Sequence, residues 1–478
     1  MKKSLKILFI LTGMLASVSC EQEFEEINKS KNSPENVSVN VLLPAAMYTQ
    51  FDNFGGRREG FMGTFTQHFA GYYTSGVNAD QYVIDNNSFS FLFTSLYSGP
   101  LNSYKDIIAR AEKEESWHYV GVAKILTALA LGTLTDVYGE IPWQEALNAD
   151  NVFPVYDTQE FVYSEIQRLL AEAIVDLGKS SFRPLADGDF VRGGNVNAWI
   201  GIAHLLRARY ENHLSKRDPA GSASRALAHV DAAKTAGLSS DTDLKMRYEG
   251  TSQVSNRWYT LWQDPAIVAS INLLDIQVAQ DDPRLESYWS PNDSQTGTYI
   301  GFVGKANGTS GGVDLISAVG PEGWYGKPNS DHMVATYFEL LFIEAEAAFR
   351  SGDLDRAATA HNEAVREQIE LVVNDPADPR IATYLNMYAN ETSVSISIEK
   401  IMTEKWKAMF TMEEETWTDM RRHNFQYPNW ISIPKKNDGT PVASEYIRRL
   451  LYPQDELDKN PENVPEVAGI FERLWWDQ

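Results

Sequence analysis

Cysteine is nearly missing from this chain: its 478 residues include a single one, Cys20. One thiol cannot close an internal disulfide, and it cannot supply a cysteine-based zinc cage. Stability must therefore come from packing. The hydrophobic fraction of 43% is sufficient for a large core, organised as one large helical domain or as two or three closely packed units.

Positive charge is also in short supply. The chain has 42 Lys and Arg against 65 Asp and Glu, which gives a net charge of -23. Such a charge repels the phosphates of nucleic acids and the head groups of anionic lipids, so we expect no nucleic acid partner. Neutral ligands such as sugars remain compatible with this charge, and so do cationic ones.

Long apolar runs are scarce. Residues 7–16 form an apolar stretch that is too short to span a bilayer, and no later stretch has the composition and length of a membrane span. We therefore expect everything after Cys20 to form a soluble domain.

Motifs for metal catalysis and nucleotide binding are missing too. The eight histidines form no H-E-x-x-H, and there is no G-x-x-x-x-G-K-[ST] loop. Residues 308–312 spell G-x-S-x-G, but a nucleophile elbow needs a strand before it and a helix after it, and this stretch is rich in Gly and Asn. Glu344 and Glu346 lie two apart on a predicted helix, so they point in different directions. We expect a protein that is not an enzyme.

We also expect no cofactor and no metal centre. A structural Ca²⁺ held by Asp and Asn oxygens of the loops is the one exception considered, although strings such as DSQTG lack the regular ligand spacing of a calcium loop.

The first feature that the sequence does contain is an export signal. Three lysines within the first six residues precede the apolar stretch 7–16 and small residues at 17–19, which predicts a signal peptide over 1–19. Cys20 follows directly, and LASVSC resembles a bacterial lipobox. That resemblance implies a lipidated Cys20, and two or three acyl chains anchor a protein stably. A chance cysteine near an ordinary cleavage site is the alternative.

An acidic tether is predicted over residues 20–40. Four glutamates follow Cys20 within six residues, and EEINKSKNSPEN has the composition of a solvated linker. A run of acids after a lipidated cysteine resembles the surface-export signal of Bacteroidetes lipoproteins, which implies a protein that faces the cell exterior. A plain linker would explain the same acids.

Helical periodicity dominates the mature chain. In the stretch 336–372, Leu341, Ala345 and Phe349 share one helix face, the pattern breaks at Ser-Gly-Asp over 351–353, and it then resumes. This pattern predicts an αα-hairpin, and its small residues resemble a tetratricopeptide unit. Weaker copies pair 120–138 with 158–178 and 196–216 with 223–238. Residues 51–100 and about 245–335 are rich in Gly, Asn, Ser and aromatics, which predicts long loops with short strands.

Several stretches, taken together and in order, resemble the SusD/RagB family of outer-membrane nutrient-binding lipoproteins. Among them are LTDVYGEIPWQEAL, DFVRGGNVNAWIGIAHLLRARY, TYFELLFIEAEAAFRSGD, IMTEKWKAMFTMEEETWTDMRRHNF and RRLLYPQDELDKNPENV. The resemblance implies a single all-α domain over 41–478, a tetratricopeptide-like superhelix of four hairpins with an irregular ligand-binding lobe. It also implies a lipid-anchored protein on the outer membrane, and a SusC-like TonB-dependent transporter as its partner.

Most residues in these motifs have a structural interpretation. Asp136 is expected to cap a turn, and Gly139 to adopt a positive φ. In EKWKAMFTMEEETWTDMRRHNF, Trp406, Phe410 and Trp417 recur at helical intervals and are predicted to lie in the core.

Charged residues of the same motif complete this interpretation. Glu413, Glu414 and Glu415 are predicted to form a solvated face, and Arg421 and Arg422 to pair with carboxylates.

A glycan site is predicted in the irregular regions, because sugars need aromatic faces over their C–H surface and polar groups for their hydroxyls. Trp324 and Tyr325, between Gly323 and Gly326, are the preferred candidates. The full set of candidate ligand-binding residues is Tyr72, Tyr73, Asn78, Asp80, Arg284, Trp289, Tyr299, Trp324 and Tyr325. Local packing of these aromatics is the alternative. Peptide capture, as in RagB-type uptake, and a pure scaffold or adhesin are the competing functions.

Overall fold

Helices make up most of the computed structural model, which describes residues 37–478 except 56, 252–253, 264, 292–300 and 312–315. Three hairpins account for the longest of them. They are α7 (Trp117–Tyr138) with α8 (Gln159–Leu177), α9 (Val196–His213) with α10 (Pro219–Thr235), and α14 (Tyr337–Ser351) with α15 (Leu354–Val372). A fourth pair joins α2 (Val39–Asp52) to α6 (Asn102–Lys113). The predicted all-α hairpin architecture is confirmed.

Local capping explains why the hairpin α14–α15 forms where the sequence predicts it. The Thr336 hydroxyl accepts from the amide of Glu339, and the Glu339 carboxylate accepts from the amide of Thr336, which closes a capping box. Gly352 ends the helix in the left-handed conformation, with φ of 81°. The Asp353 carboxylate then accepts from the amide of Arg356 and starts α15.

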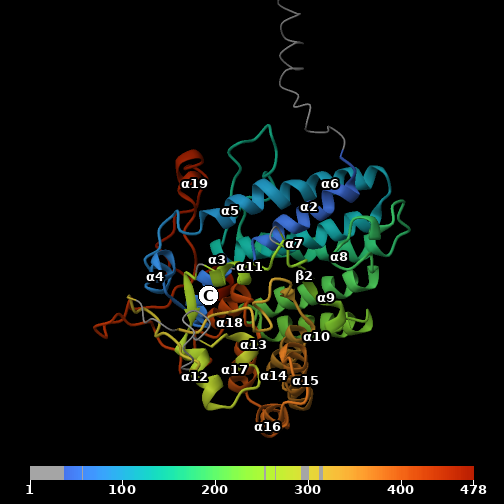
Figure 1. Ribbon diagram of the computed structural model, residues 1–478. Helices are drawn as coiled ribbons and strands as arrows, with labels where there is room; N and C mark the ends of the chain where they lie inside the picture. Colours follow the sequence, from blue (N-terminus) through green and yellow to red (C-terminus); the bar gives the residue numbers. More distant parts are fainter. Residues whose placement is uncertain (1–36, 56, 252–253, 264, 292–300, 312–315) are drawn as a thin grey trace, which may run out of the picture.

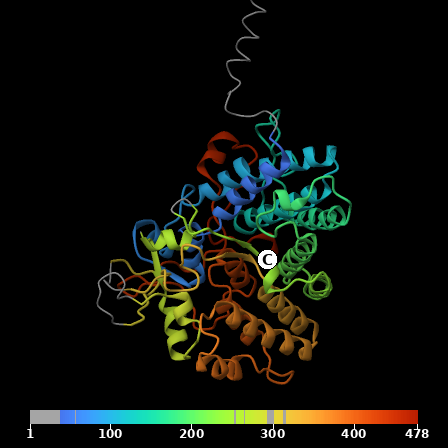
Figure 2. The same ribbon diagram turned by 45° about the vertical axis from the view of Figure 1, so that its right-hand side comes forward.

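The hairpins follow a curved path around the centre of the molecule. In Figures 1 and 2, α6 to α8 lie at the top, α9 and α10 at the right, and α14 to α16 (Pro379–Tyr388) at the bottom. Helices α17 (Ile398–Ala408) and α18 (Glu413–Arg422) lie on the inner side of this arc. Trp406, Phe410 and Trp417 are at most 3% exposed, so the core prediction is confirmed for all three.

Helix α7 corrects the expectation about apolar runs. Its 22 residues are long and apolar enough to cross a membrane by length and composition, and it is the one such helix in the described part of the chain. All of its most apolar window is buried inside the protein. Because α2, α6, α8 and α9 pack around it, we interpret α7 as the central core helix.

The two irregular regions contain more helix than the sequence predicts. Residues 51–100 hold α3 (Arg57–Thr66), α4 (Thr74–Asp80), α5 (Ser90–Leu96) and a π-helical turn, Tyr97–Leu101. Residues 245–335 hold α11 (Arg257–Gln263), α12 (Ile271–Ala279) and α13 (Leu285–Tyr288). Helices this short depend on packing more than on propensity, and they show little periodicity.

Two small antiparallel sheets complete this lobe, as predicted. β1 (Phe69–Gly71) pairs with β3 (Ile267–Ala269), with Ala70 opposite Val268. β2 (Leu244–Met246) pairs with β4 (His332–Ala335). The remaining short elements are α19 (Gln454–Lys459) and the 3₁₀ turns Leu185–Asp187, Ser240–Thr242 and Trp475–Asp477.

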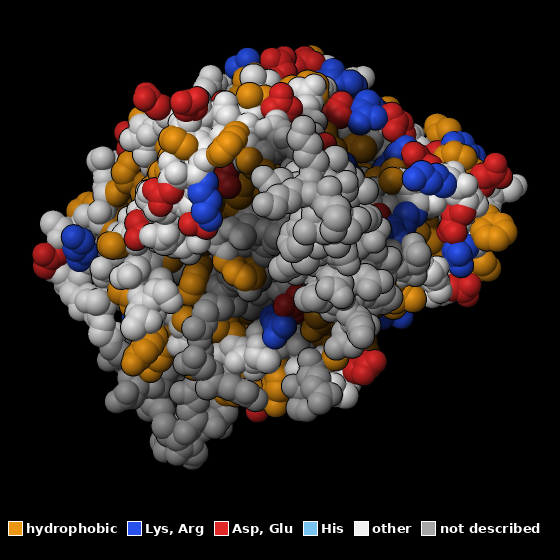
Figure 3. Space-filling model, turned by 90° about the horizontal axis from the view of Figure 1, so that it is seen from above, with side chains coloured by type: hydrophobic (Ala, Val, Ile, Leu, Met, Phe, Trp, Pro, Cys, Tyr) orange, Lys and Arg blue, Asp and Glu red, His pale blue; other side chains and the backbone are white. Residues whose placement is uncertain are grey.

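The surface carries charges of both signs. On the face seen from above in Figure 3, acidic and basic side chains are interspersed, with hydrophobic side chains between them. The excess of acidic residues in the sequence is therefore not displayed there as a single block of one sign.

Candidate functional site

A corner between β1 and α4 presents aromatic side chains to the surface. The amides of Tyr72 and Tyr73 both donate to the carbonyl oxygen of Ala266, at 2.9 and 3.2 Å. This acceptor fixes the backbone that follows β1 and leaves the Tyr73 side chain 63% exposed. Tyr72 is half-buried, and Asn78 is exposed on α4. The structure thus brings these three predicted residues together on one short segment.

Trp262, which the sequence analysis missed, belongs to the same corner. It lies in α11, is half-buried, and packs with Tyr72 against the small cluster of Val268, Ile316 and Ala318. The backbone of Gly320 passes beside its ring, since a Cβ at Gly320 would lie 3.1 Å from Trp262 Cζ3. The dense aromatic string RWYTLWQ was the available signal, but only the fold places its last tryptophan beside Tyr72.

Asp80 supports this corner from inside. Its side chain is fully buried, and its carboxylate accepts from the amides of Gly71 and Gly308 at 3.0 and 2.8 Å and from Asn307 Nδ2 at 2.7 Å. Burial raises the pKa of Asp80 to about 6, against the lowering effect of these hydrogen bonds. The expectation that Asp80 contacts a ligand is therefore corrected: it ties β1 to the loop around residue 308.

Three more predicted ligand residues are interior. Arg284 is fully buried and pairs with Asp282, at 2.7 Å, and with Glu404, at 3.3 Å. Trp289 is fully buried, and its indole N–H donates to Gln277 Oε1 at 2.8 Å. Tyr325 is 2% exposed and packs edge-on against Phe410. Because these side chains are buried and engaged within the protein, we interpret them as structural residues and not as ligand contacts.

Trp324, a preferred candidate, is half-buried. Its ring lies 4.7 Å from that of Tyr325, and it packs on the main core and on the cluster around α14, α15 and α17. Its backbone N–H donates to the carbonyl oxygen of Ser287 at 2.8 Å. It therefore packs on different clusters from the Tyr72–Trp262 pair. Tyr299, like Cys20 and the tether glutamates, lies outside the described residues.

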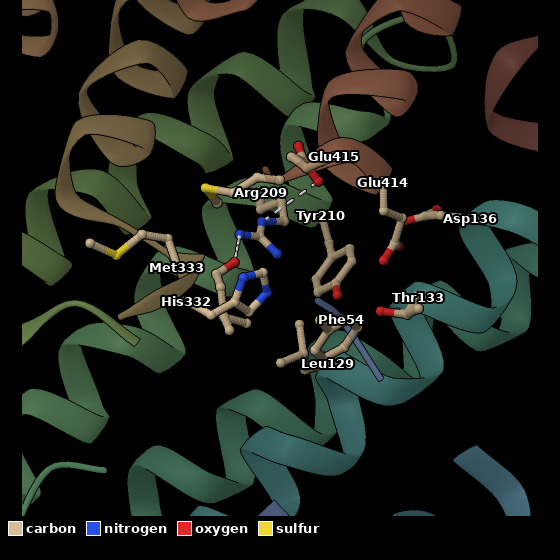
Figure 4. Close-up of a pocket in the computed structure, with 12 residues that line it drawn as sticks. Phe54, Leu129, Thr133, Asp136, Arg209, Tyr210, His332, Met333, Glu414 and Glu415 are labelled. Carbon is tan, nitrogen blue, oxygen red and sulfur yellow. Dashed lines mark hydrogen bonds and ion pairs between the residues drawn. The ribbon is translucent and has the colours of Figure 1, made fainter. Parts of the chain in front are cut away.

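A second concentration of polar groups lies in the interior, around the cavity of Figure 4. His213 lies between two carboxylates, with Nδ1 3.3 Å from Asp136 and Nε2 3.0 Å from Glu415. Burial alone would lower its pKa, but these carboxylates raise the pKa of His213 to about 9. Arg209 pairs with Glu339 at 2.6 Å. Charges buried in this way are tolerated because they are paired.

This interior network corrects two expectations. Glu413 and Glu415 are buried and Glu414 is half-buried, so they do not form a solvated face. Asp136 does not cap a turn; it accepts from the Tyr163 hydroxyl and faces His213. The positive φ of Gly139, at 93°, is confirmed.

The two arginines of α18 differ. Arg422 pairs with both oxygens of Glu346, at 2.7 and 2.8 Å, which confirms the predicted pairing with a carboxylate. Arg421 instead donates to the carbonyl oxygens of Asp136 and Arg448 and stacks on Trp417, so its predicted carboxylate pairing is wrong.

Replacement of Glu414 by Gln is expected to change how stability depends on pH. Burial and the charges of Asp136 and Glu415 raise the pKa of Glu414 from 4.5 to about 8, opposed by a hydrogen bond from Thr133 and by the charge of Arg209. Between these pH values the folded state binds more protons than the unfolded state, so the contribution of Glu414 to stability is lost as pH rises. Gln does not titrate. Relative to the natural protein, Glu414→Gln should gain about 1–3 kcal/mol in unfolding free energy between about pH 5 and pH 8.

Urea denaturation across this pH range measures the difference. His213→Gln is the useful comparison, because the His213 contribution is lost at higher pH, between its ordinary pKa of 6.5 and about 9. If the unfolding free energies of the natural protein and Glu414→Gln changed in parallel with pH, the prediction that Glu414 holds a proton in the folded state would be wrong.

The residues considered above as possible catalytic groups, Ser310, Glu344 and Glu346, do not lie in an active-site arrangement. Ser310 is exposed in irregular backbone, where its amide donates to Asn437 Oδ1 at 2.7 Å. Glu344 binds Lys234 and Arg356, whereas Glu346 binds Arg422, so the two acids face different partners. Among the described residues, no group of three His, Cys, Asp or Glu side chains could hold a metal ion.

Comparisons with known proteins address the family. A family model described as "Starch-binding associating with outer membrane", SusD-like, matches residues 31–453. A search of curated proteins finds no match.

Several solved structures share the fold. A SusD/RagB family protein from Bacteroides thetaiotaomicron VPI-5482 is 20% identical, with a TM-score of 0.77 over 92% of this chain and 99% of that one. A chitin-binding protein is 23% identical, with a TM-score of 0.75 over 92% of this chain and 100% of that one. A chitin-binding SusD homologue from Flavobacterium johnsoniae is 20% identical, with a TM-score of 0.70 over 92% and 96%. With the family model matched over most of its length, the chain belongs to the SusD-like family, which is described as starch-binding and associated with the outer membrane.

Proposed function

We propose that this protein is a cell-surface lipoprotein that captures a glycan without cleaving it and delivers it to a SusC-like TonB-dependent transporter. The observation that carries the proposal is the aromatic corner of Tyr72, Tyr73 and Trp262, with the exposed Asn78 beside it. The hydrogen bonds to Ala266 fix the backbone of Tyr72 and Tyr73 before a ligand arrives, and such preorganisation reduces the entropy lost on binding.

The chemistry of this corner suits a neutral sugar. Aromatic rings cover the C–H faces of a sugar, and an amide such as that of Asn78 replaces water at its hydroxyls. Each aromatic contact contributes about 1 kcal/mol beyond burial, so a few contacts give a weak, reversible site. The starch-binding description of the family and the chitin-binding relatives of known structure support a glycan over other neutral ligands.

Location and partner are proposed on the same basis. The family description places its members in association with the outer membrane. Lipidation of Cys20 would hold the protein there, and a weak site would release its cargo to a barrel transporter. Mass spectrometry of the mature N-terminus tests the anchor, and co-purification of a barrel protein tests the partner.

Removal of the corner aromatics is expected to weaken glycan binding. Tyr73→Ala and Trp262→Ala should each raise the Kd about 3- to 10-fold, because each loses about 1 kcal/mol of stacking. Isothermal titration with maltooligosaccharides and chitooligosaccharides measures this change. Phe182→Ala is the matched control, since Phe182 is 71% exposed and does not belong to the corner.

The outcomes distinguish the competing functions. Unchanged glycan affinity in both corner variants would reject the corner as the site. Binding of oligopeptides in place of sugars would favour RagB-type capture, and turnover of a sugar by the purified protein would reject a role in binding alone.

A further inference from the structure

A separate cavity opens between α3, α5, α7 and α18, away from the aromatic corner. Its volume is about 70 Å³. Its walls are largely apolar, and Glu414 is the one ionisable side chain among the described residues that line it. The lining residues are Asn53, Phe54, Phe61, Met62, Ser88, Phe89, Phe91, Leu92, Thr133 and Glu414.

Four phenylalanines form the walls, and none of them is fully buried. Phe54, Phe61 and Phe89 are half-buried, and Phe91 is 49% exposed. The rings of Phe61 and Phe89 meet at 88° with their centroids 6.5 Å apart, so adjacent walls are not parallel. The faces of aromatic rings carry negative partial charge and attract cations. Because adjacent rings are not parallel, the cavity favours binding of a rounded cation over binding of a flat, uncharged ring.

The base of the cavity carries a carboxyl group, that of Glu414, which a bound cation would favour in its ionised form. Phe54, Thr133 and Glu414 also line the cavity of Figure 4, so the two cavities are adjacent. In Figure 4 the Glu414 side chain extends toward Thr133, with Asp136 beside it. Two cations among the described residues nearby are engaged elsewhere, since Arg209 pairs with Glu339 and His213 lies between Asp136 and Glu415.

We propose that this cavity binds a small organic cation of the alkylammonium class, with its charged head against Glu414 and its methyl or methylene groups between the phenylalanines. A neutral sugar is a poor match, because these walls offer few partners for hydroxyl groups. The volume of about 70 Å³ takes a compact head of a few heavy atoms, so the stem of the cation would extend past the exposed edge at Phe91. This inference does not depend on the proposed function.

Proton release should accompany binding. Among the described residues, Glu414 shares the cavity of Figure 4 with Asp136 and Thr133 from α7, Arg209 and Tyr210 from α9, Glu415 from α18, and His332 from β4. Burial and the adjacent carboxylates raise the pKa of Glu414 to about 8. A cation stabilises the ionised carboxylate, so affinity should increase as pH rises from about 6 to about 8.5.

Titration calorimetry with choline tests the proposal, with 3,3-dimethylbutan-1-ol as the control ligand. This alcohol has the same shape with carbon in place of the charged nitrogen. At constant ionic strength, choline should bind at one site with a millimolar or lower Kd, and the alcohol at least about 10-fold more weakly. Sodium chloride is the control for non-specific attraction of cations to an acidic protein.

Two variants locate the site. Glu414→Gln should weaken choline binding about 10-fold and remove its pH dependence, and Phe91→Ala should weaken it about 3- to 10-fold. Phe182→Ala is the matched control and should bind choline as the natural protein does. Circular dichroism confirms that each variant is folded, and Phe91→Ala tests the site without changing an ionisable group. Equal affinity for choline and the alcohol, absence of saturable choline binding, or choline binding unchanged in both variants would overturn the proposal.

Discussion

Replacement of Arg284 by alanine is expected to lower the free energy of unfolding by about 3–5 kcal/mol. The guanidinium is fully buried and is the partner of Asp282, which is also fully buried, and of Glu404. Glu404 keeps Lys407 at 2.6 Å in the variant, but Asp282 loses its ion pair with Arg284. An unpaired buried carboxylate is costly, so most of the loss should arise at Asp282.

Arg380→Ala is the matched control for this experiment. Arg380 also pairs with two carboxylates, Asp378 and Glu286, but its side chain is 26% exposed and that of Glu286 is 51% exposed. Exposed pairs contribute about 0–1 kcal/mol. Urea denaturation of both variants at pH 7 gives the comparison. Equal losses for Arg284→Ala and Arg380→Ala would show that burial does not set the energy of these pairs. A loss of glycan affinity in Arg284→Ala with unchanged stability would restore the ligand role predicted from the sequence.

Replacement of Gly76 by alanine is expected to weaken glycan binding at least about 10-fold, a test that depends on the proposed function. An added Cβ would lie 1.9 Å from the carbonyl oxygen of Ala266. That oxygen accepts the amide hydrogens of both Tyr72 and Tyr73. A backbone atom cannot rotate away, so α4 must move and the rings of the corner must move with it.

Hydrogen exchange separates this effect from global unfolding. The amides of Tyr72 and Tyr73 should exchange faster in Gly76→Ala, while amides of α7 should keep their protection. Gly178→Ala is the control, since an added Cβ there meets its nearest atoms at 3.4 Å, an ordinary contact. Unchanged exchange at both tyrosines would show that Ala266 does not position the corner.

The helical scaffold could be predicted from the sequence because its signals are local. The break at 351–353 between two periodic stretches marks the hairpin, and the same residues supply the caps in the structure. The short helices α3 to α5 were not predicted, because seven to ten residues rich in Gly, Ser and Asn carry too few turns to show a period.

The polar interior could not be predicted from the sequence. A run of polar residues such as Glu413–Glu415 predicts a solvent-exposed helix face only where no other helix covers that face. Helices α3, α7 and α9 all pack against α18. Its carboxylates are stabilised by residues far away in the chain, such as His213 and Arg209. The aromatic corner was predicted only in part, because one of its residues is also distant in the chain. Tyr72 and Tyr73 are neighbours in sequence, whereas Trp262 joins them only through the pairing of β1 with β3.

The apolar character of α7 has a consequence for biogenesis. If the chain is exported unfolded, as the predicted signal peptide implies, this helix meets the lateral gate of a translocation channel before its neighbours can cover it. Lipid insertion at that step would trap the polypeptide in the wrong bilayer. Lys124, near the middle of this helix, makes partitioning into hydrocarbon less favourable by about 3 kcal/mol, and Asp136, near its end, adds a smaller cost. On that route, residues that the folded protein uses for ion pairing would also favour passage across the membrane.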